Sequence, residues 1–91
     1  MIQVQLVPTL SSCIETTAKR EYWQTVNEYM RGGALDEEVA GRIEVLKTFL
    51  ESADFRELRK ESERYLLEDK KIKFLLSLAE GKLECELEVT E

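Results

Sequence analysis

Residues 71–90, KIKFLLSLAEGKLECELEVT, form two halves of alternating apolar and polar residues that mirror each other about a central turn. The dipeptide Glu80-Gly81 lies between the halves and suits a two-residue hairpin turn. Because a slip of one residue would move every apolar side chain to the opposite face, the pattern predicts a single register. In that register the opposed apolar pairs are Ile72 with Val89, Phe74 with Leu87, Leu76 with Cys85 and Leu78 with Leu83.

The N-terminus predicts a third strand. Ile2, Val4 and Leu6 alternate with glutamines over residues 2–7, which is the pattern of a half-buried strand. Pro8 ends this strand, because proline has no N–H to donate to a β-ladder.

The chain after Pro8 predicts a first helix over about residues 12–31. Ser12 and Glu15 have the spacing of a capping box, and Gly32-Gly33 ends the helix because glycine adopts the left-handed conformation freely. We also predict a hinge at Gly32-Gly33-Ala34. The apolar residues at helical spacing, which we expect to be buried, are Ile14, Ala18, Tyr22, Val26, Tyr29 and Met30.

Two further helices are predicted before the hairpin. Asp36 caps the second helix, whose apolar stripe is Val39, Ile43, Leu46, Leu50 and Ala53, widened by Val45 and Phe49. Asp54 and Glu57 cap a third helix over about residues 54–68, with Phe55, Leu58, Tyr65 and Leu66 buried. Continuing this helix through Leu78 would leave the alternation at 72, 74, 76 and 78 unexplained.

The elements together predict an α+β fold in the order β-α-α-α-β-β. We expect one domain, residues 1–91, with three helices packed on one face of a three-stranded sheet that ends in the C-terminal β-hairpin. The predicted inner face of the sheet contains Ile2, Val4, Leu6, Ile72, Phe74, Leu76, Leu78, Leu83, Cys85, Leu87 and Val89.

Composition excludes several classes of function. The 91 residues include 13 Lys and Arg against 19 Asp and Glu, so the protein is acidic, with a net charge of −6. That charge argues against general nucleic-acid binding, which depends on neutralising phosphates.

There is no histidine, which removes Ser-His-Asp and Cys-His catalysis. We predict no catalytic residues and no cofactor. We expect a cytoplasmic protein without membrane attachment, because neither a signal peptide nor an apolar span is recognisable.

Cysteines and carboxylates do not form a recognisable metal site. Cys13 and Cys85 are too few and too far apart for a disulfide framework or a zinc motif, so we expect free thiols that pack as small hydrophobes. Asp36, Glu37 and Glu38 are adjacent and would diverge on a helix, which favours compensation of the helix dipole over metal binding. Glu84, Glu86 and Glu88 line the outer face of the last strand as a solvated or partner-binding strip.

Two surfaces are candidates for binding. The first is a basic face on residues 56–73, formed by Arg56, Lys60, Arg64, Lys70 and Lys71, although interleaved glutamates would repel phosphate. The second is an interface formed by Trp23, Met30, Gly41 and Val45. Trp23 and Met30 project away from the centre of the predicted core stripe, and Gly41 weakens its helix unless something approaches it closely.

The functional hypothesis is based on the second surface. We expect a small protein-interaction or regulatory module without catalytic activity, which self-associates as a two-fold homodimer, with its protein partner unspecified. The alternatives are a nucleic-acid-associated regulator that uses the basic face, and a small-molecule sensor with an apolar cavity near Tyr22 and Tyr29, between the first helix and the sheet.

Overall fold

The computed structural model describes residues 2–32 and 36–90. The elements follow the predicted order: β1 (Gln3–Leu6), α1 (Ile14–Met30), α2 (Glu37–Ser52), α3 (Phe55–Leu66), β2 (Lys71–Ala79) and β3 (Lys82–Thr90). The α+β prediction is therefore confirmed. Gly33 and Ala34 of the predicted hinge lie outside the described residues.

The sheet is antiparallel, with β2 at its centre and the order β1-β2-β3. The β2–β3 pairing has the predicted register throughout, including Leu76 opposite Cys85 and Lys73 opposite Glu88. Its turn residues, Glu80 and Gly81, have φ angles of 53° and 79°. Two positive φ angles are what a type I′ hairpin turn requires, and Gly81 adopts one without steric cost.

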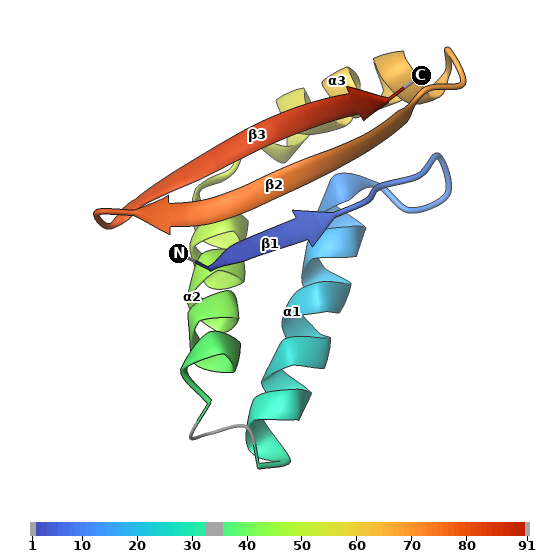
Figure 1. The fold of residues 1–91 in the computed structure, drawn as a ribbon. Helices are drawn as coiled ribbons and strands as arrows, with labels where there is room; N and C mark the ends of the chain where they lie inside the picture. Colours follow the sequence, from blue (N-terminus) through green and yellow to red (C-terminus); the bar gives the residue numbers. More distant parts are fainter. Residues whose placement is uncertain (1, 33–35, 91) are drawn as a thin grey trace.

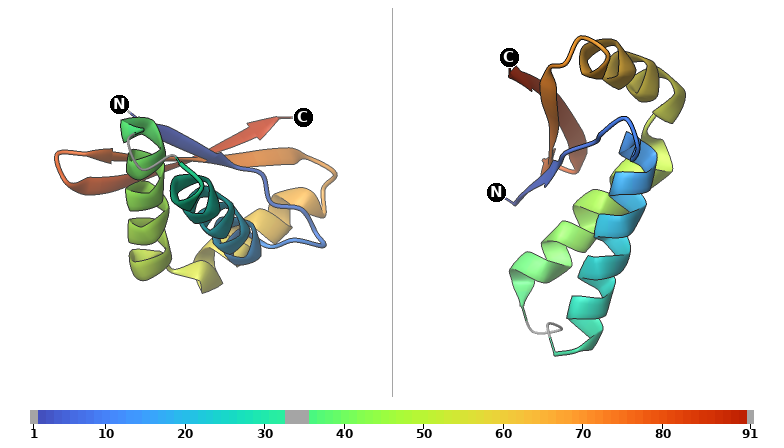
Figure 2. Two further views of the ribbon diagram at one scale, coloured as in Figure 1. Left: turned by 90° about the horizontal axis from the view of Figure 1, so that it is seen from below. Right: turned by 90° about the vertical axis from the view of Figure 1, so that its right-hand side faces the viewer.

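The three helices lie on one face of the sheet, and the other face is open (Figures 1 and 2). The α1–α2 hairpin extends beyond the β1 edge, whereas α3 lies behind β2 and β3. The overall extents are 43 × 27 × 23 Å. The core fills the space between the sheet and the helices and contains Val4, Leu6, Ile14, Ala18, Val45, Leu46, Phe49, Ile72, Phe74 and Leu76.

The N-terminus of α1 differs from the prediction. Cys13, not Ser12, is the N-cap residue, and its side chain makes no capping hydrogen bond. The backbone of Ser12 is held instead in a turn with Thr9: the Thr9 N–H donates to the Ser12 carbonyl over 2.8 Å, and the Ser12 N–H donates back over 3.2 Å. This turn delays the start of the helix by one residue.

Both predicted Asp caps are confirmed. The Asp36 carboxylate accepts a hydrogen bond from the Glu38 N–H over 2.9 Å at the start of α2. The Asp54 carboxylate accepts one from the Glu57 N–H over 3.3 Å at the start of α3. Each bond satisfies a backbone donor that the first turn of a helix leaves unpaired.

Burial differs from the prediction on α1, α3 and β3. On α3 the residues that were expected to be buried are only half-buried, while Ser62 is buried; these half-buried residues are Phe55, Leu58, Tyr65 and Leu66. Tyr29 and Met30 of α1 are exposed, because the projecting end of the hairpin has no sheet beneath it, while Thr25 is buried. The Thr25 hydroxyl donates to the Glu21 carbonyl over 2.7 Å, which allows a polar side chain to be buried there. On β3, Cys85 and Val89 are exposed although they lie on the predicted inner face.

Candidate interaction surface

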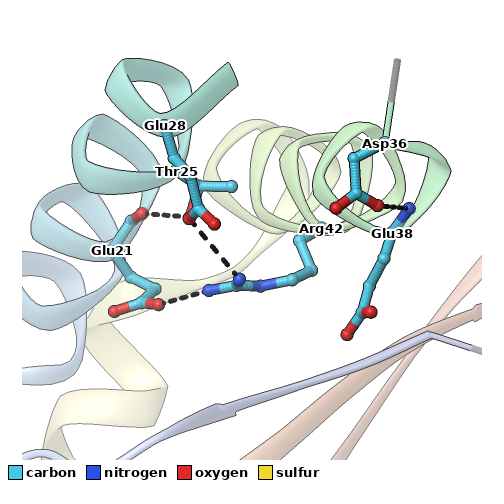
Figure 3. A network of polar contacts seen from close by, with 6 residues as sticks. All are labelled: Glu21, Thr25, Glu28, Asp36, Glu38 and Arg42. Atoms are coloured by element: carbon cyan, nitrogen blue, oxygen red, sulfur yellow. Dashed lines mark hydrogen bonds and ion pairs between the residues drawn. The ribbon is translucent and has the colours of Figure 1, made fainter. Parts of the chain in front are cut away.

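The α1–α2 hairpin has two unlike sides. On one side, the Arg42 guanidinium of α2 lies 2.8 Å from the Glu21 carboxylate and 3.9 Å from that of Glu28, both on α1 (Figure 3). The Arg42 and Glu21 side chains are each about one third exposed or less, so this pair is less screened by water than a fully exposed pair. These contacts fix how the two helices pack.

On the other side, the groove between α1 and α2 is apolar. Val26 and Tyr29 of α1 and Ala40 and Ile43 of α2 line a hollow of about 310 Å³. A hollow of this size is at the small end of ligand pockets and suits a single side chain better than a metabolite. It lies between two helices and not between α1 and the sheet, where the sensor hypothesis placed its cavity.

Next to this hollow, α1 presents two large exposed apolar side chains. Trp23 is 62% exposed and Met30 is 78% exposed, and Tyr29, which lines the hollow, is 37% exposed. The Trp23 and Tyr22 rings meet in an edge-to-face arrangement, with centroids 5.8 Å apart and planes at 75°. Trp23 and Met30 are each one helical turn from Val26, at i, i+3 and i, i+4 spacing, so they adjoin the lining of the hollow. We call these exposed residues and that lining the hairpin face: Trp23, Val26, Tyr29, Met30, Ala40 and Ile43.

Gly41 and Val45 do not belong to this face, which corrects the predicted interface. Val45 is buried in the core, so it cannot contact a second molecule. At Gly41 the close approach is made within the chain: a Cβ atom there would overlap Cδ1 of Ile2, the residue before β1. The glycine allows α2 to approach the sheet closely, which explains its place inside a helix.

Within the described residues, Lys60 and Lys70 of the predicted basic face form ion pairs, and Arg64 lies over an aromatic ring. Lys60 lies 3.8 Å from the Glu57 carboxylate and Lys70 lies 3.2 Å from that of Glu68, while the Arg64 guanidinium lies 5.6 Å from the Tyr65 ring centre. Arg56 lines an open hollow on α3 that also contains Glu15 and Glu63, and Lys71 is exposed at the start of β2. The five basic residues are thus spread along α3 and the start of β2 among acidic neighbours.

The two cysteines are free thiols, as predicted, in opposite environments. The pKa of Cys13 is lowered, chiefly by hydrogen bonds with the Thr16 side chain, 3.3 Å away, and with nearby backbone N–H groups. The pKa of Cys85 is raised, first by partial burial and then by the negative charge of Glu61. The sequence has no histidine, so neither thiol can be activated by the imidazole base that cysteine nucleophiles commonly use.

Another apolar groove, which sequence reasoning missed, lies at the opposite end of the molecule. The β1–α1 loop and the α3–β2 turn enclose about 680 Å³, lined by Val7, Pro8, Leu10, Leu66 and Ile72 together with polar residues. Val7 and Leu10 are exposed. Val7 falls on the polar side of the alternation over residues 2–7 and Leu10 lies outside any periodic segment, so the pattern of the sequence does not predict this groove.

Within residues 2–32 and 36–90, no cluster of three or more Cys, Asp or Glu side chains could hold a metal ion. Among the same residues, no helix is both long and apolar enough to cross a membrane.

The chain matches one protein-family model. No curated protein and no solved structure matches the chain significantly. One family model matches residues 2–86, which include β1, all three helices, β2 and the first half of β3. The match therefore extends over the fold as a whole, including the hairpin face, and the chain belongs to this uncharacterised protein family.

Proposed function

We propose that this protein is a small, non-catalytic interaction module that acts as a homodimer, joined through the hairpin face. The observation that carries the proposal is the exposure of Trp23 and Met30 beside the apolar hollow of Val26, Tyr29, Ala40 and Ile43. Contiguous exposed apolar surface on a small protein marks an interaction site, and tryptophan and tyrosine are enriched where interfaces gain most of their free energy.

A second copy of the chain is the occupant that fits this face best. The hairpin face itself contains no charged residue, although the chain has a net charge of −6. Its border has both signs: Lys19 precedes Trp23 by one turn, Glu44 follows Ala40 by one turn, and Lys47 follows Ile43 by one turn. A two-fold contact brings a surface against its own copy, so a neutral centre with a mixed border is self-complementary.

The hollow supports the same arrangement. Its volume of about 310 Å³ gives room for one large side chain, and Trp23 stands next to it on the same helix. In a two-fold pair, Trp23 of each copy could enter the hollow of the other. Both cysteines are free, which is consistent with a reducing compartment, and we propose the cytoplasm.

Sedimentation equilibrium over a range of protein concentrations tests the proposal. We expect a dimer that dissociates on dilution, and Trp23→Ala should weaken it by about 2 kcal/mol, or about 30-fold in Kd. Leu67→Ala is the matched control, because Leu67 is 74% exposed but lies after α3, away from the hairpin face. A single 10.6 kDa species at high micromolar concentration would refute self-association, and equal effects of both substitutions would refute the hairpin face.

The basic face supports nucleic-acid binding less well. Lys60 and Lys70 lie beside carboxylates, and Arg59 of the same helix lies 3.1 Å from Glu63. Phosphate would have to compete with these carboxylates for the same cations.

A further inference from the structure

The outer edge of β3 is a long strand edge without a partner. β3 spans nine residues and pairs along its whole length with β2. On its other side, no strand among the described residues pairs with it, since the sheet order is β1-β2-β3 (Figure 1). Such an edge presents a row of backbone N–H and carbonyl groups that another extended segment can pair with.

Beneath this edge lies an apolar hollow that the chain does not fill. Leu83 and Cys85 of β3 line it together with Phe49 and Ala53 at the end of α2 and with Leu58 of α3, and its volume is about 360 Å³. Cys85 is exposed and Leu83 only half-buried, although both point toward the helices. A strand added beside β3 would place alternate side chains over this hollow, because neighbouring strands in a sheet share their faces.

Acidic residues flank the edge on both faces. Glu84, Glu86 and Glu88 alternate along the outer face of β3, while Asp54 and Glu57 line the hollow on the inner face. Glu88 has a cation opposite, with the Lys73 ammonium 3.4 Å from its carboxylate. By contrast, Glu84 is opposite Ser77 and Glu86 is opposite Leu75, and neither forms an ion pair within the described part of the chain.

These charges discriminate between partners. If β3 paired with its own copy about a two-fold axis at Glu86, Glu84 of each copy would lie opposite Glu88 of the other, and the two Glu86 side chains would face each other. Like charges directly opposite in a sheet are destabilising, so the edge disfavours a second copy of itself. A strand with basic residues on its outer face would instead form opposite-charge pairs.

We propose that the β3 edge binds an extended protein segment in which basic and apolar residues alternate, by adding it to the sheet as a fourth strand. Its basic side chains lie beside Glu84 and Glu86 on the open face of the sheet. Its apolar side chains cover the hollow formed by Phe49, Ala53, Leu58, Leu83 and Cys85. This site shares no residue with the hairpin face, so a homodimer would present two such edges.

Binding of synthetic nine-residue peptides tests this proposal. The probe alternates Lys with Val, a first control peptide replaces each Lys by Glu, and a second replaces a central residue by Pro, which removes a backbone donor. Fluorescence anisotropy should show binding of the Lys-Val peptide, at least about tenfold weaker binding of the Pro peptide and none of the Glu peptide. Failure of the Lys-Val peptide to bind at millimolar concentration would overturn the proposal.

Variants of the protein separate a strand site from general charge attraction. Glu84→Gln with Glu86→Gln should weaken binding about tenfold, while Glu37→Gln with Glu38→Gln, the same charge change on exposed residues of α2, should leave it nearly unchanged. Bound peptide should also slow alkylation of Cys85 and leave that of Cys13 unchanged. Equal weakening by the two pairs of substitutions, or unprotected Cys85, would refute docking at β3.

Discussion

β1 and β3, the two strands that flank β2, have the same alternating pattern, but their apolar side chains are buried to very different extents. On β1, Val4 and Leu6 are 3% and 1% exposed. On β3, the residues of the same face are half-buried at Leu83 and Leu87 and exposed at Cys85 and Val89. Both strands therefore turn their apolar residues toward the helices, but the helices cover only one of them fully.

The difference follows from where the helices pack. α2 approaches the β1 side closely because Gly41 leaves room for the Ile2 side chain, and α1 packs beside it on the same side of the sheet. α3 packs against β2, and its own apolar residues, Leu58 and Tyr65, remain half-buried. Period-two alternation thus predicts which face a side chain occupies, whereas burial depends on whether a helix reaches that position.

A matched pair of leucines tests this comparison most strongly. Leu6 of β1 and Leu87 of β3 lie on opposite sides of the same residue, Phe74. Leu6→Ala should lower the free energy of unfolding by about 3–4 kcal/mol, because it leaves a cavity in a closed core. Leu87→Ala should cost about 1 kcal/mol, because water already reaches that side chain. Urea denaturation measures both.

Equal losses for the two variants would show that β3 is as well covered as β1. If Leu6→Ala does not fold, Leu6→Val measures the same site with a smaller loss, which should still exceed that of Leu87→Val.

Gly41 tests the reason why β1 is covered. Alanine is favoured over glycine in a helix by about 1 kcal/mol, but at this position the added methyl group would overlap Ile2. We expect Gly41→Ala to lower the free energy of unfolding by about 1–2 kcal/mol. In an Ile2→Val background, which lacks the overlapping Cδ1 atom, the same substitution should become neutral or stabilising. Additive effects in this cycle would show that the contact does not limit the approach of α2.

The sequence predicted most of the fold because its local signals agree with the tertiary structure. The mirrored pattern of residues 71–90 gave the hairpin register, and Asp36 and Asp54 gave two helix starts. The candidate surface was predicted only in part. Trp23 was identified because it lies off the apolar stripe. Met30 was placed both at the end of that stripe and at the interface, and Tyr29 was assigned to the core, since spacing alone does not tell where the supporting sheet ends.

Gly41 and Val45 also show what could not be predicted from the sequence alone. A glycine inside a helix correctly indicated that something approaches closely, but not whether it belongs to the same chain. Ile2 is 39 residues away in sequence, so its contact with Gly41 is a property of the tertiary packing. Val45 was predicted at an interface because it lies near Gly41 on the helix, and the same neighbourhood instead faces the core.

The smallest expected effect is on the pH dependence of cysteine alkylation. This reaction reports how far Cys85 of β3 is covered, without a substitution on that strand. Alkylation requires the thiolate, so the raised pKa of Cys85 should make it react at higher pH than Cys13, whose pKa is lowered by its hydrogen bonds with Thr16. Glu61→Gln removes a negative charge that disfavours the thiolate, so the pH profile of Cys85 should move to lower pH. Part of the upward shift should remain, because burial is its larger cause. Mass spectrometry of each cysteine peptide across pH 7–10, with Glu37→Gln as the control, follows both thiols in one sample. A Cys85 profile that matches that of an ordinary exposed thiol would mean that neither burial nor Glu61 acts on Cys85, and would leave α3 without a role in covering that strand.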